Sequence, residues 1–352
     1  MARENEERAI DDIRVAVLGY GYWGPNLARN FVSADGARVV AICDERAESR
    51  ELAASRHPNA EIVTDAADVV ASPDVDAIAI ATPVASHADL AVRALQAGKH
   101  VLVEKPFARN ASEALRMIDA AAASGRTLMV DHTFVYTGAV RKVRDLILSA
   151  ELGDLFFVDS VRVNLGLFRQ DASVLWDLAV HDLSILSLWI DPDPIAVSCV
   201  GVSHVEGMPD DIAYLTLYYP GALIGHVHVS WLSPIKIRRM LIAGSEKTVV
   251  FDDLSVDEKL KLYSRGVTRE NQVVGADLIP LAYRRTGDIW IPQIDQTEGL
   301  RVMADHFIEC CRTGRAPETG GAEGLQVVRL LEAAERSARE GGRRIDLVAE
   351  VA

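Results

Sequence analysis

Long apolar runs are absent from this 352-residue sequence. No window of about 18 consecutive apolar residues appears, which argues against a transmembrane helix. The first twelve residues, MARENEERAIDD, carry charges of both signs and lack the apolar centre of a signal peptide. We therefore expect a solvated arm before the first strand, and a cytoplasmic protein with no membrane partner.

Basic residues are in deficit, 37 against 51 acidic ones, so the formal net charge is −14. Nucleic acid would be repelled by that field and is a poor candidate partner. Cysteine is also scarce. The four cysteines form no CxxC pair, and adjacent Cys310 and Cys311 fall in a helical pattern where the spacing does not suit metal ligands. We therefore predict no disulfide framework, no metal site and a reducing compartment.

The sequence does contain alternating strand and helix signals from residue 13 to about 150. Short apolar runs such as IRVAVL, AIAI and HVLV, without polar alternation, are each followed by an amphipathic helical stretch. Such runs suit strands covered on both faces, and their repetition predicts a doubly wound α/β domain with a parallel sheet. We set this first domain at residues 1–133.

The pattern changes after Gly153. In GHVHVSW, His226 and His228 alternate with Val227 and Val229, which is typical of an antiparallel sheet with two unlike faces. One helix is expected around residues 173–190, a long loop at 265–295, and two closing helices at 296–340. The second domain, residues 134–352, is thus predicted to be α/β with an open, mostly antiparallel sheet.

Three glycines follow the first apolar run in VAVLGYGYWG. Gly19 permits a tight turn, Gly21 lets a pyrophosphate approach the backbone, and Gly24 lets the next helix pack on the sheet. That helix begins near Pro25, and its free N–H groups favour phosphate. A glycine-rich turn needs no ligand, but strand, glycines, helix and a later acid all align here. They predict a nicotinamide or flavin dinucleotide site that also includes Tyr22 and Trp23.

The later acid is Asp44, twenty residues past Gly24 at the end of the next apolar run. A carboxylate there accepts the ribose hydroxyls and repels a 2′-phosphate, so it favours NAD over NADP. Arg46 weakens this preference without reversing it.

Three stretches offer groups for moving a hydroxyl proton. Glu104 and Lys105 directly follow the apolar run HVLV, where ligands bind in such sheets, although a solvated turn is the commoner role for such a pair. Asp177 and His181 are four residues apart on the expected helix and share a face. A helix-stabilising Asp and a core histidine explain that spacing about as well. His132, after the last strand of the first domain, is expected to be structural or to line the pocket at a distance.

GYGYWG, ATPVASH, AGKHVLVEKPFA and WDLAVHD, in that order and spacing, resemble the Gfo/Idh/MocA (glucose–fructose oxidoreductase, inositol dehydrogenase, rhizopine catabolism) family along nearly the whole chain. The resemblance implies a Rossmann domain, a nicotinamide cofactor and a sugar, cyclitol or nucleotide-sugar substrate. It also implies that the second domain's open sheet packs against a partner subunit. We therefore expect a homo-dimer or homo-tetramer, as the broad alternating strands of 194–252 also suggest.

The same resemblance assigns roles to residues. Lys105 matches the family's active-site lysine, and Asp177 and His181 match its D-x-x-x-H pair, with His181 as proton acceptor or donor. The positions that border the nicotinamide and its ribose match Thr82, Pro83, His87 and Glu104. Leu175 and Trp176 depart from the family's usual small residues before the Asp, which implies a differently shaped pocket.

NLGLFR followed by VLWDLAVHD looks most like a branch of nucleotide-sugar 3-dehydrogenases. This implies oxidation of C3 of a UDP-linked N-acetylhexosamine or its uronic acid. Asn164 and Arg169 are candidate contacts to hydroxyls, carboxylate or phosphate, although a strand-end Asn and a surface Arg explain them almost equally well. The alternatives are an NADPH-dependent keto-sugar reductase of deoxysugar or antibiotic biosynthesis and, less favoured, a non-enzymatic NAD-binding sensor.

Overall fold

The computed structural model describes residues 12–166, 168–170, 172–264, 266–269, 281–284 and 286–347. The predicted N-terminal arm lies almost entirely outside them. The chain divides into two compact units. The first comprises Met1–Tyr136 and Thr297–Val328, and the second comprises Thr137–Gln296 and Arg329–Ala352.

The first unit contains a six-stranded parallel sheet in the order β3-β2-β1-β4-β5-β6, which confirms the predicted doubly wound α/β domain. Its strands are β1 (Ile13–Leu18), β2 (Ala37–Cys43), β3 (Glu61–Val63), β4 (Ala77–Ile80), β5 (His100–Val103) and β6 (Leu128–Val130). The helices between and after them are α1 (Gly24–Ser33), α2 (Ala47–Arg56), α3 (Ala66–Ala71), η1 (Val84–Ser86), α4 (His87–Gln96), α5 (Ala111–Ser124), η2 (Thr133–Tyr136) and α8 (Gly299–Thr313).

The central strands are buried throughout, as their unbroken apolar sequences require. All four residues of β4 are fully buried, as are Val15, Ala16 and Val17 of β1. β3 was not anticipated from the sequence. It has three residues and lies at the sheet edge, so EIV shows neither a long apolar run nor a clear alternation.

The closing helix α8 packs in the first unit, where Phe307 meets Phe31 of α1 with ring centroids 5.9 Å apart. The last helix, α9 (Gly321–Arg339), has its first residues in the first unit and the remainder in the second. The sequence-based boundary at 133/134 lies three residues from the division at Tyr136, but it placed both closing helices in the second domain. The domain boundaries stay a prediction.

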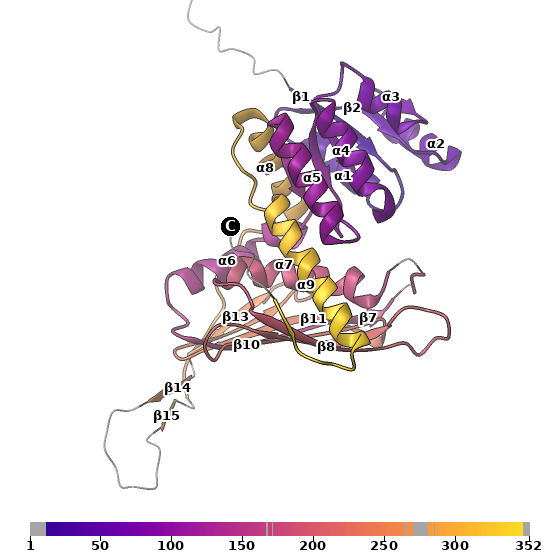
Figure 1. Ribbon diagram of the computed structural model, residues 1–352. Helices are drawn as coiled ribbons and strands as arrows, with labels where there is room; N and C mark the ends of the chain where they lie inside the picture. The colour runs from indigo at the N-terminus through magenta and orange to yellow at the C-terminus, as the bar shows by residue number, and fades with distance from the viewer. Residues whose placement is uncertain are drawn as a thin grey trace, which may run out of the picture. The chain divides into compact units, whose positions relative to one another are not determined.

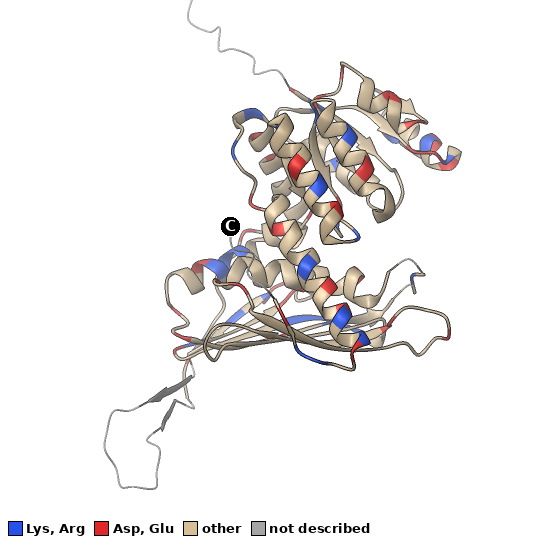
Figure 2. Cartoon of the chain, viewed as in Figure 1, with Lys and Arg blue, Asp and Glu red and all other residues tan. Residues whose placement is uncertain are grey.

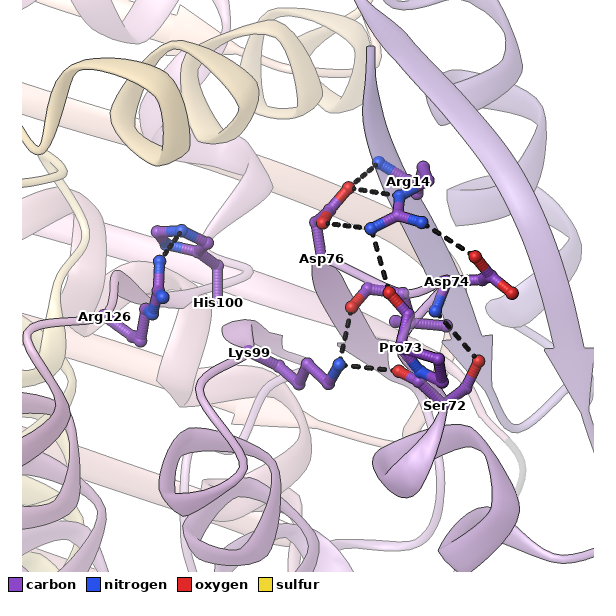
Figure 3. Close-up of polar contacts among 9 residues, drawn as sticks. Arg14, Ser72, Pro73, Asp74, Asp76, Lys99, His100 and Arg126 are labelled. Carbon is purple, nitrogen blue, oxygen red and sulfur yellow. Dashed lines mark hydrogen bonds and ion pairs between the residues drawn. The ribbon is translucent and has the colours of Figure 1, made fainter. Parts of the chain in front are cut away.

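A polar network closes the amino edge of the parallel sheet (Figure 3). The Arg14 guanidinium donates to both carboxylate oxygens of Asp76, each at 2.8 Å. Lys99 Nζ donates to the carbonyl oxygens of Ser72 and Val75, both at 2.7 Å. The charged side chains at this edge are thus bound by neighbouring residues of the protein. Ligands of doubly wound sheets bind at the opposite edge, where the carboxyl ends of the strands lie.

The second unit contains a nine-stranded sheet in the order β16-β13-β12-β11-β7-β10-β9-β8-β17. Its strands are β7 (Leu155–Leu165), β8 (Ala196–Val202), β9 (Ile212–Tyr218), β10 (Ile224–Ser230), β11 (Leu232–Gly244), β12 (Thr248–Asp252), β13 (Leu260–Tyr263), β16 (Ile289–Trp290) and β17 (Ile345–Asp346). All pairings are antiparallel except β10 with β7, which confirms the predicted mostly antiparallel sheet.

One face of this sheet is covered by helices α6 (Gly138–Leu148) and α7 (Val180–Trp189) (Figure 1). The predicted alternation of β10 is present: Val227 and Val229 are fully buried, and His226 and His228 are half-buried on the other face. The core of this unit therefore lies between the sheet and these helices.

The expected long loop at 265–295 contains regular structure. Gly266–Arg269 (β14) and Leu281–Arg284 (β15) form a two-stranded antiparallel sheet, and β16 pairs with β13. Short strands joined by turn-like sequence carry too little periodicity to be recognised.

Charged residues of both signs are interspersed along the helices, and the strands of the large sheet are mostly uncharged (Figure 2). No helix in the described part of the chain is both long and apolar enough to cross a membrane. All four cysteines are described, and each is a buried free thiol.

Candidate active site

The glycine loop after β1 has the backbone that its sequence predicts. Gly19 has φ +89°, and a Cβ there would lie 2.6 Å from the Ala81 carbonyl oxygen. A Cβ on Gly24 would lie 2.1 Å from the Gly19 carbonyl oxygen. Both positions therefore require glycine. Helix α1 begins directly at Gly24, and no acidic side chain lies in its first turn. Its free N–H groups are thus available to an anion.

Two aromatic side chains stand on this loop. Tyr22 is 86% exposed and Trp23 is 39% exposed, and their rings meet edge to face with centroids 5.6 Å apart. Neither ring belongs to the core, so both are free to contact a bound ligand.

Asp44 follows β2 and is buried beside the same loop. Its Oδ2 accepts the Tyr20 N–H at 2.8 Å, and its Oδ1 accepts the Arg46 N–H at 2.9 Å. The Arg46 guanidinium adds contacts of 3.1 Å to each oxygen. Burial acts to raise the pKa of Asp44, but the hydrogen bonds from Arg46 and Tyr20 and the charge of Arg46 together outweigh it, and the pKa is lowered. Asp44 is therefore a carboxylate at neutral pH, with Arg46 lying on it.

The segment after β4 is tied to the segment after β5 by His87. The ring of this buried histidine lies 2.9 Å from the Thr82 carbonyl oxygen through Nε2 and 3.1 Å from the Pro106 carbonyl oxygen through Nδ1. Thr82 also accepts a hydrogen bond from the Ser86 hydroxyl at 2.8 Å. Burial lowers the pKa of His87. The predicted loop Thr82–Pro83 and the Lys105 segment are therefore held next to each other.

Glu104 and Lys105 follow β5 at the carboxyl edge. Glu104 is buried, and its Oε2 accepts the Lys105 N–H at 3.1 Å. Asp131 and His132 directly follow the adjacent β6, at the positions that match Glu104 and Lys105, and are also buried. Burial, then the Asp131 carboxylate, raise the pKa of Glu104 well above its usual value. Sequence reasoning missed Asp131 because its proximity depends on the pairing of two strands that are far apart in the chain.

In the second unit, the helix predicted around 173–190 is present, with an unexpected feature at its start. Leu175–Ala179 form a π-helical turn, η3, that leads into α7. Asp177 lies in this turn and His181 is the second residue of α7. The apolar spacing of this stretch predicted one continuous helix, so the π-turn was not anticipated from the sequence. Such turns occur often at functional sites.

Asp177 is oriented by two further side chains. The indole Nε1 of Trp231 donates to Asp177 Oδ2 at 3.2 Å, and the Arg169 guanidinium lies 3.8 Å from Oδ1. Arg169, predicted as a substrate contact, thus forms an ion pair with a predicted catalytic residue. Asn164 is half-buried near the end of β7. Trp231 was not identified as a site residue from the sequence, because the alternating pattern of GHVHVSW indicated only that its side chain faces inward.

A buried ion pair fixes the helix immediately after His181. Arg162 of β7 donates to Asp182 through Nε at 2.8 Å and through a terminal nitrogen at 3.1 Å. The Ser160 hydroxyl donates to the same carboxylate at 2.9 Å. Asp182 therefore points toward the sheet, while Asp177 points toward Trp231.

The residues of the first unit fit a dinucleotide. Any side chain at Gly19 or Gly24 would collide with the backbone of the loop region. Asp44 directly follows the neighbouring strand, β2. Gly19, Gly21 and the start of α1 would hold the pyrophosphate, and Asp44 would hold the ribose of the adenosine half. The structure thus brings the predicted cofactor residues together in one unit, and Asn164, Arg169, Asp177 and His181 lie in the other.

A doubly wound sheet with this loop is typical of a dinucleotide-binding protein. Residues 13–132 match the NAD-binding Rossmann fold of the Gfo/Idh/MocA oxidoreductase family, and residues 169–347 match the C-terminal alpha/beta domain of that family. The chain belongs to this family and is an NAD(P)-dependent oxidoreductase, as the motifs predicted.

Individual relatives are named enzymes. The chain is 29% identical over 342 residues to D-apiose dehydrogenase of Paraburkholderia graminis, covering 93% of this chain and 88% of that one. It is 30% identical over 259 residues to UDP-N-acetylglucosamine 3-dehydrogenase of Acidithiobacillus ferrooxidans, covering 72% and 78%. The WlbA dehydrogenase of Bordetella pertussis, solved with NADH and UDP-GlcNAcA, shares the fold with a TM-score of 0.80 at 22% identity, covering 97% and 99%.

Proposed function

We propose that this protein is an NAD-dependent dehydrogenase that oxidises a ring hydroxyl, at C3, of a sugar or nucleotide sugar such as a UDP-linked N-acetylhexosamine or its uronate. The observation that carries the proposal is the Asp177–His181 helix turn, held by Trp231 and Arg169, in a chain with a dinucleotide-binding unit. The named relatives support a sugar substrate, and one of them is a UDP-N-acetylglucosamine 3-dehydrogenase.

His181 and Lys105 share the work on the hydroxyl. His181 accepts the hydroxyl proton, and Asp177 stabilises the charge that the imidazole acquires. Lys105, as a cation, stabilises the alkoxide that develops on the same oxygen. A bound nicotinamide supplies the hydride acceptor. Arg169 neutralises part of the Asp177 charge and presents the rest of its guanidinium to an anionic group of the substrate.

Substitution tests these roles directly. Removal of a general acid–base group typically lowers turnover by about 10²–10⁴-fold, so His181→Ala should do so while NAD binding, measured by calorimetry, is retained. Lys105→Ala should act in the same direction. Leu148→Ala, an exposed position on α6, is the control. Unchanged turnover in both His181→Ala and Lys105→Ala would show that these residues are not the catalytic ones.

The substrate is found by a panel. Nucleotide sugars, their uronic acids, free aldoses including apiose, and cyclitols are offered with NAD, and reduced nicotinamide is followed by absorbance. The proposal expects the highest kcat/KM for a UDP-linked N-acetylhexosamine or its uronate. A preference for a free pentose or a cyclitol would reject the nucleotide-sugar assignment and keep the dehydrogenase assignment.

The preference for NAD rests on Asp44. A carboxylate at this position accepts ribose hydroxyls and repels a 2′-phosphate. Arg46 already occupies both Asp44 oxygens, so NAD binding requires Arg46 to give up some of these contacts. Arg46→Ala should therefore strengthen binding of NAD relative to NADP, measured by calorimetry without substrate. A shift toward NADP would contradict the assignment.

The main alternative is an NADPH-dependent keto-sugar reductase. The Arg46 guanidinium, 64% exposed beside Asp44, is the feature that favours it, because a guanidinium can bind a 2′-phosphate. Titration with both cofactors decides: tighter binding of NADPH than of NADH supports the reductase.

The open face of the nine-stranded sheet is proposed to bind a second copy of this chain, as a homo-dimer or half of a homo-tetramer. Strand register puts Val200 opposite Tyr214 and Tyr214 opposite His228, so these side chains share the face away from α6 and α7. Val200 is 54% exposed and Tyr214 is 44% exposed. By the same register Asp159 and Arg239 lie on this face, so two copies related by a two-fold axis can pair opposite charges.

Light scattering tests the assembly. The full chain should be a dimer or tetramer, and Tyr214→Glu should dissociate it, whereas Leu148→Glu, on an exposed position of α6, should not. A monomeric unsubstituted protein at micromolar concentration would reject this interface.

A further inference from the structure

Two acidic residues lie side by side at the carboxyl edge of the first unit's sheet. β5 and β6 are parallel neighbours with Val103 opposite Val130, so the residues that follow, Glu104 and Asp131, are neighbours too. The Asp131 N–H donates to the Val103 carbonyl at 2.8 Å, which fixes this register beyond the strand ends. Side chains at matching positions of two parallel neighbouring strands point to the same face of the sheet, so the two carboxyl groups lie next to each other.

The surroundings of this buried pair favour one bound proton. Glu104 is 6% exposed and Asp131 is 2% exposed. Glu104 Oε2 accepts the Lys105 N–H and Asp131 accepts the Thr133 hydroxyl, but Glu104 Oε1 is buried with no donor among the described residues. An ionised carboxylate is acceptor-only, so two of them can bond only if one carries a hydrogen. Two adjacent buried like charges also cannot both ionise at ordinary cost.

The charged and titratable groups around the pair come from three elements. Lys105 acts on both carboxyl groups and favours their ionised forms. His132, next to Asp131, is buried, and burial together with Lys105 lowers its pKa to about 4, so it is neutral. His87 of α4 is fixed to the Thr82 and Pro106 carbonyls, and burial lowers its pKa. Among these groups, Lys105 is the cation that acts on both carboxyl groups, and one proton on the pair balances the charge.

We propose that Glu104 and Asp131 share one proton at neutral pH, and that the pair positions Lys105 by presenting one negative charge to its ammonium group. The catalytic role of Lys105 is taken from the proposed function. Glu104 and Asp131 are positioning residues, because they act through Lys105. If both carboxyl groups were ionised, they would bind the Lys105 ammonium group tightly to the pair. If neither were ionised, the ammonium group would have no negative charge from the pair.

The shared proton makes a distinctive prediction for amide substitutions. Glu104→Gln mimics the protonated acid and leaves Asp131 ionised, whereas Asp131→Asn removes the like charge and lets Glu104 ionise. Each single variant keeps one negative charge beside Lys105, and only the double variant removes it. The effect on Lys105 should therefore be absent in both single variants and present in the double variant. A residue that acts through packing alone would not produce this pattern.

The experiment is pH-dependent labelling of amines with acetic anhydride on the full chain without cofactor or substrate, followed by mass spectrometry of the peptide containing Lys105. An amine reacts only when deprotonated, so the midpoint of labelling against pH reports how strongly Lys105 holds its proton. Loss of a neighbouring opposite charge should move the midpoint down by about one to three pH units in the double variant and leave it in place in each single variant. Lys247, paired with Glu151 in the other unit, is the internal reference and should not move.

A midpoint that falls in either single variant would overturn the proposal, because both carboxyl groups would then be ionised in the unsubstituted protein. An unchanged midpoint in the double variant would overturn the positioning role. If an amide variant fails to fold, infrared titration of the unsubstituted protein replaces it. The stretching band of a protonated carboxyl should persist at pH 7 and disappear at alkaline pH, and its absence at pH 7 would refute the shared proton. Neither measurement needs turnover, so loss of the proposed dehydrogenase function would be recognised separately, from Lys105→Ala.

Discussion

Breaking the buried ion pair between Arg162 and Asp182 should strongly destabilise the second unit. The Asp182 carboxylate is 1% exposed, the Arg162 side chain is 4% exposed, and three hydrogen bonds of 2.8 to 3.1 Å converge on the carboxylate from Arg162 and Ser160. Asp182→Asn removes the charge and places an NH₂ group against donors. Breaking one partner of a buried pair costs about 3–5 kcal/mol, because the other charge stays in the low-dielectric interior.

In a domain of this size, each kcal/mol corresponds to about 2–4 °C in Tm, so Asp182→Asn should lower the Tm by about 6–20 °C. Replacing both partners with apolar residues, Arg162→Met with Asp182→Leu, should recover much of the loss. The assay is calorimetry or thermal unfolding followed by circular dichroism.

Asp346→Asn is the matched control for this experiment. Asp346 pairs with Arg344 at 3.3 Å in the same unit, but the two side chains are 81% and 50% exposed. Exposed pairs contribute little, so its Tm should change by less than about 2 °C. A Tm for Asp182→Asn within that same range would refute the view that this pair anchors α7.

Four further substitutions test particular contacts of the structure. Burial raises the folded-state pKa of Glu104. The stability contributed by this carboxyl group is therefore complete below its unfolded-state pKa and is lost as pH rises through its folded-state pKa. Glu104→Gln should consequently gain Tm relative to the unsubstituted protein as pH increases from 5 to 9. Glu298→Gln should show the opposite trend. The hydrogen bond from Arg29 lowers the folded-state pKa of Glu298, so the loss of Tm in this variant should shrink as pH falls below about 4.5. A parallel pH trend of Tm in the two variants would contradict the sign argument. Trp231→Phe removes the hydrogen bond to Asp177, so turnover should fall by about tenfold with little change in NAD affinity; equal turnover would mean that the indole does not orient Asp177. Gly19→Ala should abolish NAD binding, measured by calorimetry, because a Cβ there would lie 2.6 Å from the Ala81 carbonyl oxygen. Gly125→Ala, at a helix end with open space around it, is the control and should bind NAD normally. Retained NAD binding in Gly19→Ala would show that the loop can rearrange.

Local signals in the sequence were sufficient for the cofactor half of the molecule. The strand, the glycines, the start of α1 and Asp44 are all specified within about 30 residues, and each has a steric or electrostatic requirement that few residue types satisfy. The position of Arg46 on Asp44 was not accessible in this way, because a flexible side chain chooses among partners only once the backbone is in place.

Longer-range features explain the remaining gaps. Asp131 is 27 positions from Glu104, and only the register of β5 and β6 brings the two acids together. Trp231 reaches Asp177 because β10 ends near the first turn of the helix, across 54 positions of sequence. The sequence pattern placed Trp231 on the inward-facing side of its strand and made no prediction for Asp131, and it contained no information about which neighbour either residue would meet.

The π-turn at Leu175–Ala179 gives the helix of the second unit one residue more per turn than ordinary winding accommodates. The extra residue is equivalent to a one-residue insertion that is accommodated within the turn. Deleting one residue there would restore regular α-helical winding and rotate everything on one side by about 100° relative to the other. Asp182 could then face Arg162, or Asp177 could face Trp231, but the two contacts could not both survive. The local winding is therefore a genetic constraint as well as a structural one: substitutions in this stretch can be tolerated, whereas a single-codon deletion is expected to separate the anchoring of the helix from the orientation of its polar face.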